Sequence, residues 1–279
     1  MAGKVIGVQS EKGGVGKTMA VCQIAFELTE QGSKVCVVDN DPQGNATSSF
    51  FGDKEDGGWP TAITGEGGDN PVALTEHLYR RESFAPLQVL EGNDSLWLLG
   101  PSDDLAVLES ESGDAGNSEE HEGELIQGFC DSIDLLCEAF DYIIIDNGPS
   151  FNRKFTASLA ASESGGVLLP MTPDFDPLRG VKRAISRIER MREIFDIDIP
   201  VIGILLNLWE TNPVTQVAKS VKADLETEYG ELVFKSVLHK AADLQKARGL
   251  QEWIGHLAPK SKAAAQITEI TNELERRVR

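Results

Sequence analysis

A glycine-rich stretch near the start of the chain constrains the fold more than any other feature. Residues 10–19 read SEKGGVGKTM. They follow a short β-branched run at residues 4–8 and precede apolar residues at helical spacing over residues 18–31, which predicts a strand, a loop and a helix in that order. A continuous apolar strand is predicted next, at residues 34–38. Two strands joined through a helix pair in parallel by a right-handed crossover, so these residues form a βαβ unit.

The same alternation of strands and helices continues along the chain. Further buried strands are predicted at residues 95–99, 142–145, 166–170 and 201–206, and helices near residues 72–81, 124–139, 153–162, 178–194, 214–228 and 261–278. This pattern predicts an α/β fold with a doubly wound, mostly parallel sheet flanked by helices, in a single domain over residues 1–279. Ligands of such sheets bind at the carboxyl ends of the strands. Four residues follow predicted strands there: Gly13, Asp39, Asp146 and Asn207.

The net charge of −19 is unevenly distributed. Residues 1–150 hold 7 Lys and Arg against 28 Asp and Glu, whereas residues 151–279 hold 19 against 17. The second half can therefore present a basic face although the whole chain is acidic. Two acidic, glycine-rich stretches, residues 52–70 and 109–123, are expected to be mobile surface insertions. Their acidity either keeps the protein soluble or serves a partner.

Length and composition also bear on the class of protein and its compartment. With 279 residues, 41% of them hydrophobic, the chain can bury a large core. No apolar run approaches the ~20 residues of a membrane span and no signal peptide is recognisable, so a soluble, cytoplasmic protein is expected. The four cysteines form no C-x-x-C pair and have no histidine at zinc spacing, so buried reduced thiols are expected at Cys22, Cys36, Cys130 and Cys137.

The end of the glycine-rich loop carries its chemistry. Gly16, Lys17 and Thr18, placed between a strand and a helix, are typical of the end of a P-loop. Backbone N–H groups at the helix start surround phosphates, Lys17 neutralises their charge, and the Thr18 hydroxyl binds Mg²⁺. The general pattern G-x-x-x-x-G-K-[ST] is not met, because Glu11 stands where the first glycine belongs. The position between strand and helix argues against a chance glycine turn.

Residues 12–18, KGGVGKT, resemble the signature-lysine loop, a deviant Walker A motif, of the ParA/MinD superfamily of ATPases. In that family the first lysine reaches across a dimer interface to the nucleotide of the other subunit, which implies this role for Lys12. The resemblance also implies ATP and Mg²⁺ as ligands and a homodimer that forms with ATP, so that nucleotide binding and self-association are coupled. The nucleotide-binding residues carried over are Lys12, Gly13, Gly14, Val15, Gly16, Lys17, Thr18 and Met19.

Two later segments add to the resemblance. Residues 37–47, VVDNDPQGNAT, are close to the family's D-x-D-P-Q-G-N-x-T segment, which implies that Asp41 orients or activates the attacking water and joins Lys12 and Lys17 as a catalytic residue. On its residues alone, Asp41 is also a typical turn former before proline. Residues 142–150, YIIIDNGPS, look like the Walker B strand, which implies that Asp146 holds the Mg²⁺ hydration shell, with Asp39 as a further candidate.

The resemblance extends over nearly the whole chain with lower specificity. Residues 95–109 look like the strand and P-S-x-x-L stretch of plasmid and chromosomal ParA proteins, and residues 168–173 and 203–207 look like their later strands. Asn207 is a candidate for contacting the adenine base, although an asparagine there also caps turns. Gly148 departs from the family, which has the first of two prolines at that place, so the turn after the Walker B strand is looser here.

The surface on which such an ATPase works separates the members of the superfamily. MinD-like members end in an amphipathic membrane helix, whereas ParA-like members bind DNA through basic residues without sequence preference. The last predicted helix has a narrow apolar stripe of Ile267, Ile270, Leu274 and Val278. Such a stripe is typical of packing on the parent domain, and membrane association is not expected. A metallocluster-carrier ATPase needs paired cysteines at the dimer axis, which Cys130 and Cys137 do not supply.

Basic residues of the second half are candidates for binding DNA phosphates, which requires positive charge within reach and no sequence reading. The candidates are Lys219, Lys222, Lys235, Lys240, Lys246, Arg248, Lys260 and Lys262. A scatter of solvated surface lysines is the alternative. Where ParA-like chains carry Pro-Arg and a second Arg, this chain has His239, Lys240 and Asp243, so a different set would contact DNA.

A second basic surface is predicted on the helix at residues 178–194. Its basic residues are Arg179, Lys182, Arg183, Arg187, Arg190 and Arg192. In the family this region faces the dimer and partner side, so the resemblance allows a docking role for it.

The function implied is that of a ParA-like ATPase that segregates or positions DNA or another large cargo. Such a protein would be cytoplasmic and nucleoid-associated, with slow, Mg²⁺-dependent hydrolysis stimulated by a ParB-like or cargo-adaptor partner. A MinD-like membrane-associated positioning ATPase and a metallocluster carrier are the alternatives. Sequence-specific operator binding is not expected, because the nucleotide fold starts at residue 4.

Overall fold

A single sheet organises the molecule. The computed structural model describes residues 2–66, 72–90, 93–108, 118–173, 177–208 and 216–278. The strands of these residues are β1 (Lys4–Val8), β2 (Val35–Asn40), β3 (Leu87–Leu90), β4 (Asn93–Leu99), β5 (Tyr142–Asn147), β6 (Gly166–Met171) and β7 (Val201–Leu206). Their order is β3-β4-β2-β5-β1-β6-β7, and every pair is parallel except β3 with β4. The predicted doubly wound, mostly parallel sheet is confirmed.

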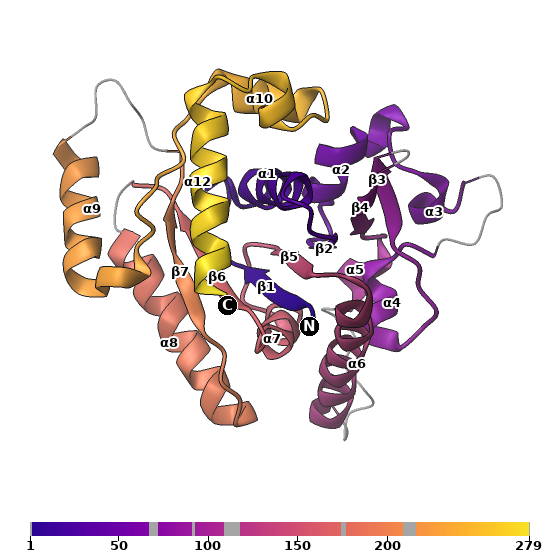
Figure 1. Cartoon of the computed structure of the whole chain (residues 1–279). Coiled ribbons are helices and arrows are strands. Elements are labelled where there is room, and N and C mark those ends of the chain that lie inside the picture. Colours follow the sequence, from indigo (N-terminus) through magenta and orange to yellow (C-terminus); the bar gives the residue numbers. More distant parts are fainter. Residues whose placement is uncertain are drawn as a thin grey trace.

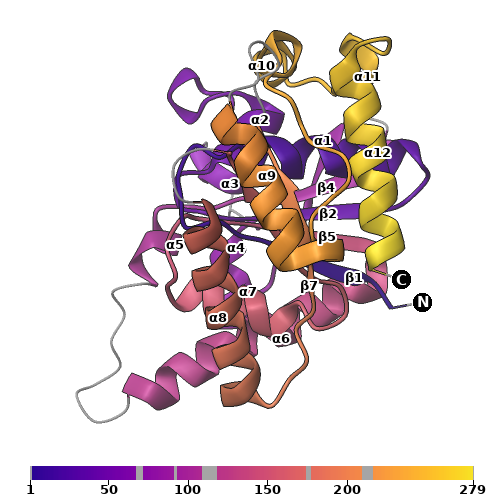
Figure 2. The same cartoon turned by 90° about the vertical axis from the view of Figure 1, so that its left-hand side faces the viewer.

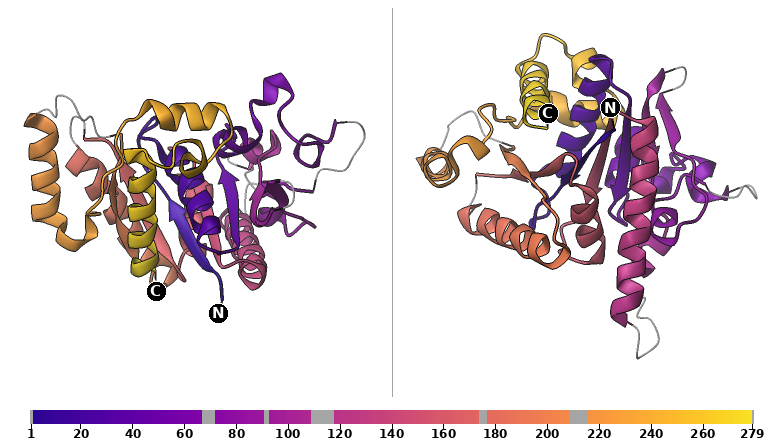
Figure 3. Two further views of the ribbon diagram at one scale, coloured as in Figure 1. Left: turned by 45° about the horizontal axis from the view of Figure 1, so that its top comes forward. Right: turned by 60° about the horizontal axis from the view of Figure 1, so that its bottom comes forward.

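Helices cover both faces of this sheet (Figure 1). On one side lie α1 (Lys17–Glu30), α2 (Asn45–Phe51), α10 (Ala242–Gly249), α11 (Ile254–Leu257) and α12 (Lys262–Arg277). The other side carries α4 (Thr75–Arg80), α6 (Ser118–Ala139), α7 (Arg153–Ala161) and α8 (Pro177–Phe195). The remaining helices are η1 (Lys54–Asp56), α3 (Thr61–Thr64), α5 (Asp104–Val107), α9 (Gln216–Tyr229), which packs beside α8, and η3 (Gly230–Leu232). Figure 3 shows the resulting layers and the end of α6 projecting beyond the sheet.

The central strands are buried on both faces, which explains their continuous apolar sequences. The polar residues that follow the apolar runs of β2 and β5 are still part of these strands. Asp39 pairs with Asp146 and Asn40 with Asn147 in the register of β2 with β5. The prediction that Asp39 and Asp146 follow their strands is therefore wrong by one or two residues. The pairing extends past the apolar run because these side chains find polar partners inside the protein.

Residues expected to form loops contain regular structure. Within residues 52–70, η1 and α3 form, and Trp59 and Ile63 are buried, so apolar contacts organise a stretch whose composition suggested a loop. Residues 118–123 belong to α6, which begins six residues before the predicted helix. Residues 67–70 and 109–117 lie outside the described residues. The antiparallel edge strand β3 and the short helices α2 and α10 were not predicted either, because each is too short for a periodic pattern.

Helix α1, which starts at the glycine-rich loop, is buried along most of its length. It contacts β2, α2 and α12. Its buried Gln23 donates from Nε2 to the carbonyl of Glu252 at 3.2 Å and accepts at Oε1 from the backbone N–H of Ile254 at 2.8 Å. This side-chain amide thus fastens α1 to the segment between α10 and α11.

The last helix packs inward, as its apolar stripe predicted. Ile267, Ile270, Leu274 and Val278 are all buried, and α12 lies against α1 (Figures 1 and 2). Among the described residues, no helix is both long enough and apolar enough to cross a membrane. The apolar face of α12 is therefore occupied by the protein's own core.

Candidate functional site

The glycine-rich loop connects β1 to α1 at the carboxyl edge of the sheet. Its backbone turns through left-handed conformations at Gly14 and Gly16, where φ is 77° at both residues. Side chains other than glycine are strained in this region. A Cβ atom on Gly16 would also lie only 2.7 Å from Nδ2 of Asn207. Both observations explain why glycine is needed at Gly16, directly before Lys17 opens α1.

Asn207, which follows β7, braces this loop. Its buried side-chain Nδ2 donates to the backbone carbonyls of Val15 and Gly16, both at 2.9 Å. Its Oδ1 has no hydrogen-bond partner among the residues that the structure describes. The amide group therefore already fixes the loop from the end of β7, which lies beyond β6 in the sheet, and a contact of Asn207 with an adenine base stays a prediction.

Thr18 and Asp146 meet at the start of α1. The Thr18 hydroxyl donates to Oδ2 of Asp146 at 2.7 Å. Lys17 is also close enough for its charge to lower the pKa of Asp146, although burial outweighs both effects and the net pKa shift of that carboxyl is upward. The first turn of α1 and the end of β5 thus bring the predicted lysine, hydroxyl and carboxylate together.

Asp39 lies beside Asp146 in the buried sheet edge. Burial, and then the negative charge of Asp146, raise the pKa of Asp39. Its Oδ2 accepts two hydrogen bonds from Thr47, one from the backbone N–H and one from the hydroxyl, both at 2.8 Å. Asp39 therefore also holds the start of α2 against β2. This structural role was not predicted, since nothing in the sequence links residues 39 and 47 beyond their shared motif.

The carboxylate oxygens at this edge fit a divalent cation. Oδ1 of Asp39 and Oδ1 of Asp146 are buried and lack a hydrogen-bond partner among the described residues. A hard cation beside them would supply the missing partner and favour their ionised forms. The described residues contain no cluster of three or more His, Cys, Asp or Glu that could hold a metal. A cation here would thus depend on the Thr18 hydroxyl, Asp146 and ligand oxygens, as Mg²⁺ commonly does.

Asp41 is half-buried in the segment after β2. Its Oδ1 accepts from the backbone N–H of Gln43 at 3.1 Å, and its carbonyl accepts from the N–H of Gly44 at 2.9 Å. A Cβ atom placed on Gly148 would lie 3.4–3.6 Å from the Asp41 carboxyl group. The turn-forming role of Asp41 is thus visible. The departure at Gly148 brings the segment after β5 to within ordinary contact distance of this carboxylate.

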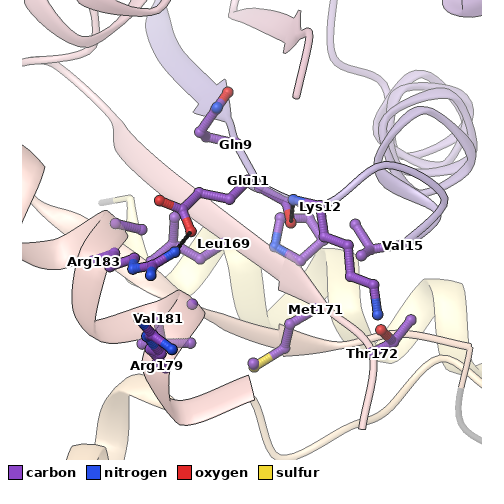
Figure 4. A pocket seen from close by; sticks show the side chains of 14 residues that line it. Gln9, Glu11, Lys12, Val15, Leu169, Met171, Thr172, Arg179, Val181 and Arg183 are labelled. Carbon is purple, nitrogen blue, oxygen red and sulfur yellow. Dashed lines mark hydrogen bonds and ion pairs between the residues drawn. The ribbon is translucent and has the colours of Figure 1, made fainter. Parts of the chain in front are cut away.

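A cavity of about 290 Å³ lies between the loop and α8 (Figure 4). Its lining includes exposed Lys12 from the loop, Thr172 after β6 and Arg179 from α8. Glu11 forms an ion pair with Arg183 at 3.5 Å across this space. The position that lacks the first P-loop glycine therefore carries a side chain that reaches the basic helix. Sequence alone gave no signal for this pair, because 172 positions separate its members.

Behind the site, a buried polar network joins β2 to β5. Asn40 Nδ2 donates to Asn147 Oδ1 at 2.9 Å, and Tyr79 donates its hydroxyl hydrogen to Asn40 Oδ1 at 2.9 Å. Asn147 Nδ2 in turn donates to Ser158 Oγ at 2.9 Å. Sequence analysis missed these residues, because isolated asparagines at strand ends are equally typical of turns.

Lys219 and Lys222 lie on α9, Lys246 and Arg248 on α10, Lys240 just before α10, and Lys260 and Lys262 at the start of α12, elements that Figure 2 labels. Lys235 lies apart from them, because its backbone N–H bonds the carboxylate of Glu273 near the end of α12. All are exposed except Lys222, which is half-buried and pairs with Glu226 at 3.7 Å. The positive charges of Lys262 and Lys222 both act on His239. At least these two candidates therefore gather around one point. Asp243 lies in the first turn of α10.

None of the four cysteines is bonded to another. All four are free thiols: Cys22 and Cys36 are buried and Cys130 and Cys137 are partly buried on α6. The prediction of buried thiols is thus met by Cys22 and Cys36, whereas Cys130 and Cys137 on α6 are only partly buried.

A parallel sheet, a phosphate-type loop on its central strand and a Thr–Asp pair at the carboxyl edge define an α/β nucleotide-binding protein of the P-loop class. A family model described as an AAA domain matches residues 3–201. The chain belongs to this family and to the ParA/MinD superfamily of ATPases, as its motifs predicted.

Relatives and solved structures agree with this assignment. The chain is 28% identical to the chromosome-partitioning ATPase Soj of Thermus thermophilus, over 98% of this chain and 96% of that protein. It is 25% identical to the sporulation initiation inhibitor protein Soj of Bacillus subtilis, with 98% of each chain covered. The structure of apo McdA from Cyanothece superposes with a TM-score of 0.78 at 17% identity, covering 98% of this chain and 99% of that one, which shows the same fold.

Proposed function

We propose that this chain is a ParA-like ATPase that positions or segregates DNA or another large cargo. In this proposal ATP drives homodimerisation, the dimer binds DNA without sequence preference, and a ParB-like or cargo-adaptor partner stimulates a slow hydrolysis that ends each cycle. The protein would act in the cytoplasm on the nucleoid. The observation that carries the proposal is the signature-lysine loop, with Thr18 hydrogen-bonded to Asp146, Lys17 near enough for its charge to act on that carboxylate, and Lys12 exposed beside it.

Each side chain of the site has a separate task in hydrolysis. Lys17, placed at the first position of α1, offsets the negative charge of the β- and γ-phosphates. The N–H groups of the loop and of the first turn of α1 point to the same phosphates. Asp41 orients the attacking water, and Lys12 brings a cation to the nucleotide of the second subunit. Lys12 thereby makes triphosphate binding and dimerisation one coupled equilibrium.

Thr18 and Asp146 would hold Mg²⁺, with Asp39 behind them. When bound, the ion neutralises charge that develops on the phosphate oxygens during transfer. The unpartnered Oδ1 atoms of the two aspartates support this assignment. A structure of cobyrinic acid a,c-diamide synthase from Mycobacterium smegmatis, 26% identical to this chain with a TM-score of 0.71, contains an ATP analogue and magnesium.

The DNA surface departs from the ParA-like pattern at His239 and Asp243, and the proposal for it rests on charge. Lys219, Lys222, Lys240, Lys246, Arg248, Lys260 and Lys262 lie on α9, on α10 and around the start of α12. The basic face of α8 lies beside the loop and is coupled to it by Glu11 and Arg183. We assign DNA contact to the first surface and partner docking to the second.

The proposal is tested by DNA retention and sizing of the purified protein with ATP, ADP or no nucleotide, at low and moderate salt. We expect a dimer that retains DNA only with ATP and releases it as salt rises. Lys12→Ala should bind ATP as a monomer and fail to retain DNA, whereas Lys54→Ala, which removes an exposed lysine of η1, should behave as wild type. A wild-type protein that stays monomeric with ATP would refute the proposal.

A MinD-like role is the second outcome that the same assay separates. Anionic liposomes replace DNA in a parallel sedimentation measurement. The apolar stripe of α12 is buried against the protein's own core, so we expect no ATP-dependent liposome binding. Dimerisation with liposome binding and without DNA retention would move the assignment to a membrane-associated ATPase.

A further inference from the structure

His239 is held in one orientation by the start of the last helix. Its backbone N–H donates to Oε1 of Gln266 at 3.3 Å, and its ring Nδ1 contacts Nε2 of the same amide group. Gln266 is buried in α12, whereas His239 is half-buried in the segment between η3 and α10. One side-chain amide therefore fixes both the main chain and the ring of His239.

This double contact determines which ring nitrogen carries the proton. A backbone N–H is always a donor, so it requires the Gln266 oxygen to face it. The Gln266 Nε2, which can only donate, then faces Nδ1, and Nδ1 must accept. The proton of the neutral ring accordingly resides on Nε2. Burial lowers the pKa of His239, the hydrogen bond with Gln266 opposes this effect, and the charges of Lys262 and Lys222 add to the lowering, so the net shift favours the neutral form.

The opposite ring nitrogen meets a second donor. Nε2 of His239 lies 3.5 Å from Nζ of Lys262, the first residue of α12. An N–H group and an ammonium group thus adjoin each other. Among the described residues no carboxylate forms an ion pair with Lys262, so no protein acceptor resolves this contact. Two adjacent donors of this kind suit an oxygen that belongs to a ligand.

The surroundings favour an anion. Lys222 on α9 also acts on the ring, although its own ammonium group is paired with Glu226, so it contributes mainly long-range charge. Lys262 stands at the N-terminus of a helix of 16 residues, where the helix dipole adds positive potential. Lys240 follows His239 directly in the chain. Both the two donors and the positive local potential therefore favour a negatively charged ligand.

We propose that His239 and Lys262 form a two-donor site for one phosphate group of the DNA backbone, with Nε2–H of the ring and the ammonium group binding its oxygens. The inference rests on the proposed DNA-binding function and identifies how that surface works. It gives a role to the position where the family pattern has proline. Gln266 is the positioning residue, because it aims the ring and fixes its tautomer.

The test is DNA affinity, measured by fluorescence anisotropy of a labelled random-sequence duplex with ATP and Mg²⁺ at several salt concentrations. His239→Ala and Lys262→Gln should each weaken binding about 10- to 100-fold, as expected for loss of a hydrogen bond to a charged group. Because both act on one phosphate, the double variant should lose less than the product of the two single effects. His77→Ala and Lys54→Gln, on α4 and η1, are the matched controls.

Salt dependence separates the two donors. Lys262→Gln should reduce the slope of log affinity against log salt by about 0.9 per protomer, since it removes a cation from a phosphate. His239→Ala should leave that slope unchanged, because the ring is neutral. A merely structural loss would instead lower the melting temperature and ATP binding, which are measured in parallel. Lys262 is exposed, so its variant tests the site even if His239→Ala folds poorly.

The outcomes distinguish this site from the function on which it rests. If wild type retains DNA but both variants bind within twofold of it at every salt concentration, the two-donor site is wrong and the proposed function stands. If wild type dimerises with ATP without retaining DNA, the proposed DNA-binding function fails and the site fails with it.

Discussion

The hydroxyl of Thr18 donates a 2.7 Å hydrogen bond to the carboxylate of Asp146, which joins the first turn of α1 to the end of β5. Strand β5 lies next to both β1 and β2 in the sheet. The loop, its following helix and the carboxylate are therefore fixed to one edge of the sheet, and such preorganisation reduces the cost of binding.

Replacing Thr18 by valine tests this relationship. Valine keeps the branched shape but removes the hydroxyl, so both the hydrogen bond to Asp146 and the proposed Mg²⁺ ligand are lost. We expect the affinity for Mg²⁺–ATP to fall by about 10- to 100-fold, the usual effect of disturbing groups around a metal site. Titration calorimetry with Mg²⁺ and with EDTA measures it. Thr18→Ser, which restores the hydroxyl, should recover most of the affinity; equal affinity of the valine variant and wild type would contradict the assignment.

Asp41 carries two proposed roles that substitutions can separate. Asp41→Ala should slow ATP hydrolysis by about 100-fold or more if the carboxylate positions or activates water, and should leave an ATP-bound dimer that persists on a sizing column. Asp41→Asn keeps an oxygen for the 3.1 Å hydrogen bond from Gln43 and so preserves the turn. Full recovery of the hydrolysis rate in the asparagine variant would show that the turn alone matters.

Gly16 is expected to tolerate no side chain. Its φ of 77° strains alanine by about 1–2 kcal/mol, and the new Cβ would meet Nδ2 of Asn207 at 2.7 Å. We expect Gly16→Ala to lower the free energy of unfolding by about 2–3 kcal/mol and to weaken ATP binding. Urea denaturation measures the first effect. Gly13→Ala is the control, because no atom lies within 4 Å of its Cβ position, and its stability should stay within about 0.5 kcal/mol of wild type.

The cysteines are expected to be unreactive in the native protein. Burial, with the nearby charge of Asp134, raises the pKa of Cys130 to about 12 and that of Cys137 to about 11. A raised thiol pKa keeps the sulfur protonated below that pH, so at pH 8 only about one Cys137 in a thousand is a thiolate. We expect thiol labelling at pH 8 to be at least 100-fold slower than in denaturant, where the pKa is about 8.5. Rapid labelling of two native thiols would return weight to a metallocluster carrier.

The sequence predicts the sheet because its strands are buried on both faces and therefore consist of long apolar runs. The motif and the strand pattern also indicate that Thr18 and Asp146 meet at one edge of the sheet, as the hydrogen bond between them shows, although Asp146 belongs to β5 and does not follow it. The features that the sequence did not predict depend on contacts between segments that are distant along the chain. Nothing local indicates that Asn207 binds the Val15 and Gly16 carbonyls, because that contact exists only once β7 is placed beyond β6.

Short helices and strands, and the polar residues at the ends of strands, were predicted least well. β3 has only four residues, and its pairing with β4 is antiparallel, so neither length nor periodicity distinguishes it from a loop. Trp59 and Ile63 lie in a glycine-rich, acidic stretch whose average composition conceals two residues that are buried. Glu11 was recognised as a departure from the loop pattern, but its partner Arg183 comes from a helix far along the chain.

The two hydrogen bonds of the Gln23 side chain have a mechanical consequence. Gln23 lies six positions after Lys17 in α1, about 9 Å along a helix that is about 21 Å long. Its side-chain amide is hydrogen-bonded to the main chain of Glu252 and Ile254. These residues follow shortly after α10, whose surface carries Lys246 and Arg248. About 9 Å of α1 thus separates the phosphate loop from the segment that follows α10. A shift of the first turn of α1 at the nucleotide would be passed through Gln23 to that segment, next to the surface that carries Lys246 and Arg248.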